Sequence, residues 1–236
     1  MSGIAIIPAR SGSKRILNKN IRNFQGAPII SYPITTAIES GLFSQVYVST
    51  DSPEIADIAR SYGAVVPWLR DKILSSDTAS TLSVLADEIR KHQLIGEEPR
   101  NICCIYPTTP LLSAEYLKNG LLKLISGDWD YVISVTKNVF KPQRILTLDS
   151  TQQIQMLLPH FEQVRTQDLS ESYSDAGQFY WGTSDAWLKS LPIFTSKSTI
   201  IELSAASSVD IDTEEDWLRA EEIFKSMNKK ANASLF

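Results

Sequence analysis

The chain has 236 residues, of which 43% are hydrophobic and 21% charged, and its formal net charge is −4. This composition is typical of a folded globular protein and argues against disorder, and its mild acidic excess argues against a large nucleic-acid surface, which needs a basic stripe. No apolar run approaches the roughly 18 residues that a membrane helix needs, so we expect no membrane partner. The length suits one domain over residues 1–236, and the charge balance leads us to expect no nucleic-acid partner.

Short β-branched runs alternate with longer amphipathic segments in the first part of the chain. In chain order we expect strands at 4–8, 46–50, 101–106 and 131–136, and helices at 31–40, 53–62, 78–93 and 114–126. This alternation is typical of βαβ units. It predicts an α/β fold with a mostly parallel sheet between helices.

The alternation breaks after Lys137. The pattern then predicts a hairpin of 144–149 with 152–158 and a polar stretch at 160–174. A strand at 178–182, a helix at 185–191 and a closing helix at 214–227 follow. We interpret residues 138–176 as a small lobe inserted into the α/β domain.

Two cysteines, Cys103 and Cys104, are adjacent within an expected strand. Neighbouring strand residues point to opposite faces, so the pair suits neither a disulfide nor a shared metal. We interpret both as reduced core thiols. Reduced thiols, together with an N-terminal sequence that lacks the pattern of a secretory signal, predict a cytoplasmic protein.

The loop after the first expected strand is rich in cations for an acidic chain. Five basic residues fall within thirteen positions, namely Arg10, Lys14, Arg15, Lys19 and Arg22. Gly12 allows close approach of the backbone to a ligand, and Ser11 and Ser13 add hydroxyl donors. The loop has neither the Walker pattern nor three fingerprint glycines. Its place beyond the carboxyl end of a strand favours a polyphosphate site over a solvated basic loop.

Two acidic positions near the closing helix allow more than one interpretation. Asp210 and Asp212 are two apart, so on an extended segment both carboxylates face one side and can share a hard cation. Asp212 or Thr213 could instead cap the helix that follows. The run at 77–80 likewise suits a helix cap as well as a contact to nucleotide.

Several motifs resemble those of one enzyme family. They are "IPARSGSKR" (7–15) with Lys19 and Asn20, "VSTDSPEIADIARSYGA" (48–64), "LRDKILSSDTAS" (69–80), "YPTTPLLSA" (106–114), "RTQDL" (165–169), "DAGQFYW" (175–181) and "VDIDTEEDW" (209–217). In this order they resemble the CMP-nonulosonic acid synthetases, or acylneuraminate cytidylyltransferases. The "YPT" and "DAGQFYW" forms are most similar to pseudaminic acid cytidylyltransferases, whereas the sialic acid enzymes usually carry Gln at the position of Tyr106.

The resemblance implies a reaction and a fold. The reaction is transfer of CMP from CTP to the anomeric hydroxyl of an acidic nine-carbon sugar, with release of pyrophosphate. The fold is a Rossmann-like nucleotide-diphospho-sugar transferase fold, in a homodimer joined through the 138–176 lobe. The alternatives are sialic, legionaminic or an eight-carbon octulosonic acid as the sugar, and a non-catalytic nucleotide-binding regulatory protein.

The resemblance also implies roles for individual residues. The implied catalytic residues are Arg10, Lys14, Lys19, Arg165 and Asp212. The implied nucleotide contacts are Ala9, Arg10, Ser13, Asn20, Arg70, Ala79 and Thr81. The implied sugar contacts are Tyr106, Thr108, Gln167, Asp168 and Gln178. Asp210 and Asp212 would hold Mg2+, and Arg165 would reach the site from the lobe, in its own chain or from the partner of a dimer.

Overall fold

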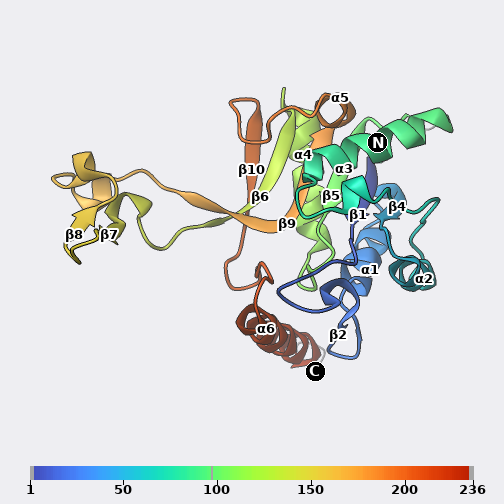
Figure 1. The fold of residues 1–236 in the computed structure, drawn as a ribbon, viewed down its shortest axis with the longest axis horizontal. Helices are drawn as coiled ribbons and strands as arrows, with labels where there is room; N and C mark the ends of the chain where they lie inside the picture. The colour runs from blue at the N-terminus through green and yellow to red at the C-terminus, as the bar shows by residue number, and fades with distance from the viewer. Residues whose placement is uncertain (1–2, 97, 234–236) are drawn as a thin grey trace.

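A six-stranded sheet of order β10-β6-β9-β5-β1-β4 organises the computed structural model, which describes residues 3–96 and 98–233 (Figure 1). Its strands are β1 (Gly3–Pro8), β4 (Phe43–Ser49), β5 (Asn101–Ile105), β6 (Tyr131–Lys137), β9 (Tyr173–Thr183) and β10 (Ser198–Leu203). Strand β1 is parallel to β4 and β5, and β10 is parallel to β6, whereas β9 runs antiparallel between β5 and β6. The mostly parallel α/β sheet is therefore confirmed.

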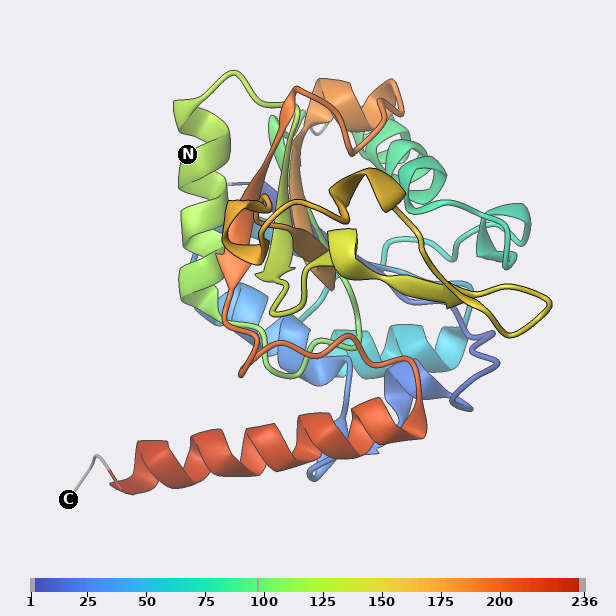
Figure 2. The same ribbon diagram turned by 90° about the vertical axis from the view of Figure 1, so that its left-hand side faces the viewer.

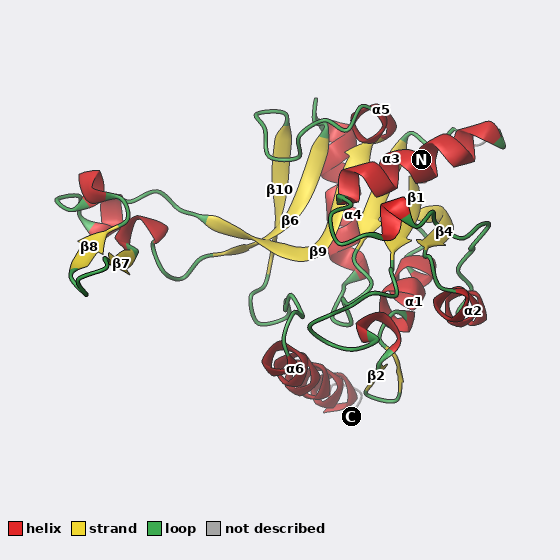
Figure 3. Ribbon diagram, viewed as in Figure 1, coloured by secondary structure: helices red, strands yellow, loops and turns green. Residues whose placement is uncertain are grey.

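Helices cover both faces of this sheet (Figure 3). They are α1 (Ser31–Glu39), α2 (Pro53–Ser61), α3 (Thr81–Leu94), α4 (Ala114–Ser126), α5 (Ser184–Leu188) and α6 (Glu214–Ala233). Buried residues of α1, α2 and α4 pack on one face, and those of α3 and α5 on the other. Helix α6 packs on the segment between β1 and α1, outside both faces (Figure 2).

Short elements complete the chain. They are the strand pairs β2 (Asn23–Phe24) with β3 (Ala27–Pro28) and β7 (Leu146–Leu148) with β8 (Ile154–Met156), and the 3-10 turns η1 (Lys19–Ile21), η2 (Ile73–Ser75), η3 (Pro142–Arg144), η4 (Pro159–Phe161) and η5 (Thr166–Asp168). Across the described ranges, no helix has the length and apolar character needed to cross a membrane.

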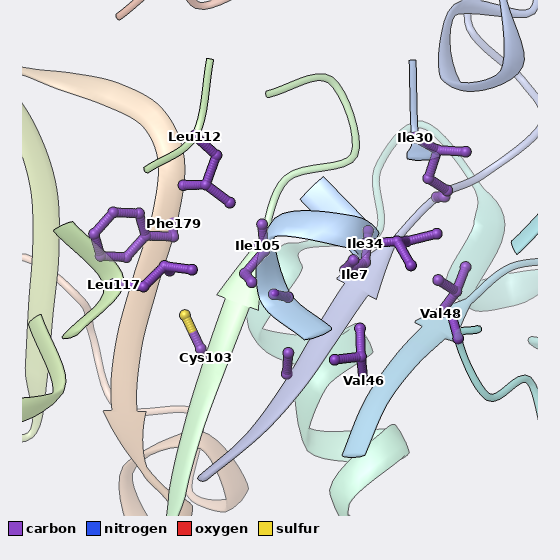
Figure 4. Close-up of a cluster of buried hydrophobic side chains, with 14 of the residues drawn as sticks. Ile7, Ile30, Ile34, Val46, Val48, Cys103, Ile105, Leu112, Leu117 and Phe179 are labelled. Atoms are coloured by element: carbon purple, nitrogen blue, oxygen red, sulfur yellow. The ribbon is translucent and has the colours of Figure 1, made fainter. Parts of the chain in front are cut away.

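The two cysteines lie on opposite faces of β5. Cys103 packs beside Leu117 and Phe179 on the α4 side (Figure 4), and Cys104 packs in the cluster beneath α3. Both thiols are free and fully buried, and this burial raises the pKa of each above its ordinary value. They are core thiols, as the sequence predicts.

Several boundaries differ from the sequence predictions, for identifiable reasons. Helix α3 begins at Thr81 rather than at 78, because the Ser80 hydroxyl accepts the backbone N–H of Ser83 and caps the helix. Strand β9 begins at Tyr173, since its first residues continue the pairing with β6. Strand β10 was not predicted at all.

Residues 138–172 lie outside the main sheet. They carry β7, β8 and three of the short turns, and Figure 1 shows them at the far end of a twisted ribbon formed by β6 and β9. Because Tyr173–Asp175 pair with β6, the predicted end of the lobe at 176 is a few residues too late.

Candidate active site

A cavity of about 470 Å³ opens at the carboxyl ends of β1 and β5, the edge at which open α/β sheets bind ligands. It brings together ten of the predicted site residues, which are Arg10, Ser13, Lys14, Lys19, Asn20, Arg70, Ala79, Thr81, Tyr106 and Thr108. Residues from four separate stretches of sequence therefore converge on one hollow.

A second cavity, of about 300 Å³, adjoins the first and shares Lys19, Tyr106 and Thr108 with it. Its remaining wall is formed by Asp175, Gly177, Tyr180, Asp210 and Asp212. The two cavities differ in charge, because the first contains most of the cations of the loop and the second contains three carboxylates. We call them the cationic cavity and the acidic cavity.

The loop after β1 is tied to the rest of the site by its own polar groups. The Asn20 side chain, which is buried, donates from Nδ2 to the carbonyl of Arg10 at 2.9 Å. Lys19 Nζ donates to the carbonyl of Ile211 at 2.6 Å and lies 3.4 Å from Asp212 Oδ1. Lys19 therefore stands at the junction of the two cavities with its charge already directed at the acidic one.

Asp77 lines the cationic cavity, and the sequence analysis placed it in a run that suits either a helix cap or a contact to nucleotide. Its Oδ1 lies 2.5 Å from Arg10 Nη1, and its Oδ2 pairs with Lys14 Nζ. These bonds, first that from Lys14 and then that from Arg10, lower the pKa of the Asp77 carboxyl. Since Ser80 caps α3, Asp77 is not the cap.

Arg70 is the most enclosed cation of the cationic cavity, with 6% of its surface exposed. Its backbone N–H donates to Thr50 O at 2.7 Å, while its Nε and Nη2 are buried without a hydrogen-bond partner among the described residues. Burial lowers the pKa of this guanidinium, and the charges of Asp51 and Glu88 act in the opposite direction. Unpaired buried donors are costly, so these two atoms suit a ligand acceptor.

Two tyrosines separate the cavities and connect them by hydrogen bonds. Tyr106 Oη lies 3.2 Å from Thr81 Oγ1, and the Tyr106 ring meets Tyr180 edge-on at 5.6 Å between centroids. Tyr180 Oη in turn donates to Asp175 Oδ2. Burial raises the pKa of both phenols, so both remain protonated donors at neutral pH.

Asp175 and Tyr180 are site residues that the sequence analysis missed. Both lie within the quoted "DAGQFYW" motif, but neither was given a role there. Phe179 and Trp181 of the same motif are fully buried in the core. Tyr180 projects from the other face of β9 and reaches the acidic cavity.

Asp210 and Asp212 both face the acidic cavity, while Ile211 between them is fully buried. The alternation predicted for an extended segment is thus present. One side of Asp210 remains exposed, yet the surrounding protein removes enough water to raise the pKa of its carboxyl, and the nearby charge of Asp212 raises it further.

The helix cap is formed by Thr213, one of the two candidates that the sequence offered, together with Asp216. Thr213 Oγ1 accepts the backbone N–H of Asp216, and Asp216 Oδ2 accepts the backbone N–H groups of Asp212 and Thr213, as in a capping box. The Asp212 carboxylate is therefore not used as a cap. It instead pairs with Arg15 Nη1 at 2.8 Å and with Lys19.

These carboxylates fit a small hard cation. Asp210 and Asp212 converge on one cavity, where burial first and then the charge of Asp212 raise the pKa of the Asp210 carboxyl. Among residues 3–96 and 98–233, no group of three or more His, Cys, Asp or Glu side chains could hold a metal ion. Mg2+ uses one or two carboxylates together with phosphate oxygens and water, which matches this donor set.

Gly177 determines how close Asp210 can approach β9. Its φ is +59°, and a Cβ built there would lie 2.8 Å from the carboxyl carbon of Asp210. Gly177→Ala should displace that carboxylate and cost about 1–2 kcal/mol of stability from the left-handed backbone. We expect a higher Mg2+ concentration for half-maximal activity and a lower unfolding temperature.

Gly41→Ala is the matched control, because Gly41 has a similar φ of +64° and nothing within 4 Å of the added Cβ. It should lower the unfolding temperature alone. An unchanged Mg2+ requirement in Gly177→Ala would show that Gly177 does not position Asp210.

Five predicted residues lie outside both cavities. Arg165, Gln167 and Asp168 are in the lobe, where Arg165 Nε donates to Asp168 Oδ2 at 2.7 Å. None of the three lines either cavity of its own chain. Gln178 is buried and donates to Ser208 Oγ, and Ala9 is enclosed in the core, so neither side chain reaches a ligand in this arrangement.

The chain is similar to known cytidylyltransferases. The family model described as "Cytidylyltransferase" matches residues 4–233. The chain is 39% identical over 231 residues to a pseudaminic acid cytidylyltransferase of Campylobacter jejuni, covering 98% of this chain and 100% of that protein. It is 32% identical over 232 residues to a CMP-N,N'-diacetyllegionaminic acid synthase of Legionella pneumophila, covering 97% and 98%.

A solved structure shares the fold. The chain superposes on a CMP:2-keto-3-deoxy-manno-octonic acid synthetase complexed with CTP, with a TM-score of 0.72 and 14% identity, over 96% of this chain and 100% of that one. At this identity the likeness shows a shared fold and no more. The family match, in contrast, spans nearly the whole chain, and the protein therefore belongs to the cytidylyltransferase family of nucleotidyltransferases.

Proposed function

We propose that this enzyme transfers CMP from CTP to the anomeric hydroxyl of pseudaminic acid and releases pyrophosphate. The observation that carries the proposal is the pair of adjoining cavities, one cationic and one acidic, that share Lys19, Tyr106 and Thr108. Full-length similarity to the Campylobacter pseudaminic acid enzyme supports the choice of sugar.

The cationic cavity would hold CTP. Arg10 and Lys14 would bind the phosphates, and their charge would stabilise the negative charge that builds on the departing pyrophosphate. The free donors of Arg70 match the carbonyl and ring nitrogen of cytosine, because both of those atoms are hydrogen-bond acceptors. Asn20, which already fixes the loop through Arg10 O, would contact the ribose.

The acidic cavity would hold the reacting ends of both substrates. Asp210 and Asp212 would hold Mg2+, which when bound neutralises charge on the α-phosphate and orients the attacking oxygen. The anomeric oxygen forms a bond to the α-phosphorus as the bond from that phosphorus to the bridging oxygen breaks, and pyrophosphate leaves with the bond's electrons. Asp212 would accept the hydroxyl proton, with the positive charge of Lys19 beside it.

The sugar would lie against the two tyrosines. Tyr106 presents a protonated phenol held by Thr81, and Asp175 offers a carboxylate oxygen to amide N–H groups of the sugar. Compared with sialic acid, pseudaminic acid carries a second acylamino group and a terminal methyl in place of a hydroxyl. The aromatic ring of Tyr106 would suit those less polar substituents better than the Gln amide that sialic acid enzymes usually carry at this position.

Steady-state kinetics with a panel of acids tests this proposal. At saturating CTP and Mg2+, we expect kcat/KM for pseudaminic acid to exceed the values for sialic, legionaminic and octulosonic acids. A higher value for legionaminic or sialic acid would reassign the sugar and leave the reaction in place. Absence of pyrophosphate release with every acid would favour the non-catalytic nucleotide-binding alternative.

We further propose that two copies associate through the lobe, in the cytoplasm, where the buried thiols stay reduced. The lobe is rich in apolar side chains that are more than half exposed, namely Val139, Phe140, Leu146, Leu148 and Ile154. An exposed apolar surface of this kind is typical of a protein interface. A second copy would cover it and would bring Arg165 of one lobe toward the cavities of the other copy.

A paired substitution in the lobe tests the homodimer. Leu148 and Ile154 are directly opposed in the β7–β8 pair, so Leu148→Asp with Ile154→Asp places two charges on one patch. Sedimentation equilibrium should give twice the chain mass of 26.3 kDa for the unaltered protein and the single mass for the variant. Leu94→Asp, at an exposed position in α3, should remain dimeric. A monomeric unaltered protein would contradict the proposal.

A further inference from the structure

We propose that Asp77 is an internal competitor of the nucleotide phosphates, a carboxylate that holds Arg10 and Lys14 and that CTP must displace to reach them. This inference rests on the proposed function, in which those two cations bind the phosphates. It assigns to Asp77 control over how tightly the site holds polyphosphate, including the pyrophosphate product.

The contacts of Asp77 carry the inference. Each carboxylate oxygen serves one cation, Oδ1 at 2.5 Å from Arg10 Nη1 and Oδ2 paired with Lys14 Nζ. Asp77 itself lines the cationic cavity, so the carboxylate stands inside the space that the phosphates need. Both cations lower the pKa of this carboxyl, which therefore stays charged at neutral pH.

Local structure does not require the charge of Asp77. The cap of α3 is Ser80, and the preceding turn is closed by Asp71 Oδ1, which accepts the N–H of Ile73, and by Ser76 Oγ, which donates to Ile73 O. The Arg10 bond instead joins positions 67 residues apart, linking the segment before α3 to the loop after β1. The carboxylate is thus directed at the cations rather than at its own backbone.

Charge decides the outcome of the competition. A carboxylate has one negative charge, and partly exposed ion pairs of this kind are weak, so phosphates with several charges displace it readily. Had Asp77 stayed between the cations, its charge would repel the bound phosphates. Because binding of phosphates breaks the ion pairs of Asp77, the affinity of the site for polyphosphate is lower by the free energy of those pairs. The lower affinity favours release of pyrophosphate after each turnover.

Calorimetric titration with inorganic pyrophosphate tests the inference in three proteins. Asp77→Asn keeps the shape but removes the charge, and its Kd for pyrophosphate should fall about fivefold at low ionic strength, the scale of exposed ion pairs. The gain should shrink at high salt, because the pairs are screened. Asp71→Asn removes the same charge from the same segment without touching Arg10 or Lys14, and its Kd should match that of the unaltered protein.

Thermal unfolding supplies a second readout. Asp77→Asn should lower the unfolding temperature without pyrophosphate and match the unaltered protein at saturating pyrophosphate, where the ion pairs are already broken. An equal loss in both conditions, or an unchanged or higher Kd, would overturn the inference. If the unaltered protein failed to bind pyrophosphate and CTP, the proposed function would be contradicted instead.

Discussion

Asp212→Asn should abolish nearly all turnover, with kcat reduced by about 10³-fold, because we propose that this carboxylate holds the metal that would supply several kcal/mol of charge stabilisation at the phosphates. The change also removes the ion pairs with Arg15 and Lys19, and Lys19 keeps only its hydrogen bond to the carbonyl of Ile211. Residual activity should require more Mg2+. Initial rates of pyrophosphate release across a Mg2+ titration measure both effects.

Asp216→Asn is the matched control for this result. Asp216 belongs to the capping box of α6 and not to the acidic cavity, so its loss should cost about 1 kcal/mol of stability and leave kcat nearly unchanged. The two aspartates are only four residues apart, yet Asp212→Asn should lower kcat whereas Asp216→Asn should lower only the stability. If Asp212→Asn lowered only the unfolding temperature and kept its activity, the proposed metal site would be wrong.

Lys14→Ala should lower kcat/KM by about 10²–10³-fold, the range for losing one strong electrostatic donor to a transition state. The fold should survive, since the Lys14 side chain is 80% exposed and its ion-pair partner is the partly exposed Asp77. Circular dichroism and steady-state kinetics with varied CTP measure the two quantities.

Lys72→Ala removes an exposed charge outside both cavities and should retain full activity. A Lys14→Ala enzyme with near-normal kcat/KM would remove Lys14 from the phosphate site. Tighter pyrophosphate binding by Asp77→Asn together with weaker binding by Lys14→Ala would instead support the account of both residues.

Local patterns predict the parts of the fold that local physics decides. The β1–α1 and α4–β6 stretches follow from apolar periodicity, and the carboxylates of Asp210 and Asp212 share a face because extended chains alternate. Whether Asp212 caps the last helix was not decidable from spacing alone, and the observed bonds of Thr213 with Asp216 show that it does not. Its role as a metal ligand stays a prediction.

Long-range pairing explains what the sequence analysis missed. Strand β10 finds its partner β6 only through tertiary structure, and β9 owes its antiparallel direction to a chain that returns from the lobe. The same return brings Asp175 and Tyr180 to the acidic cavity. Asp77 meets Arg10 and Lys14 across a large sequence separation, so no local motif indicates that contact.

The most direct test of the central claim follows the atoms of the reaction. Phosphorus NMR should show the three CTP resonances replaced by those of pyrophosphate and one CMP ester when the enzyme receives CTP, Mg2+ and pseudaminic acid. A heavy-oxygen label on the anomeric hydroxyl should appear in the CMP-sugar and not in pyrophosphate, because that oxygen attacks the α-phosphorus. Label in pyrophosphate, or consumption of CTP to CDP and phosphate without a sugar ester, would contradict the account.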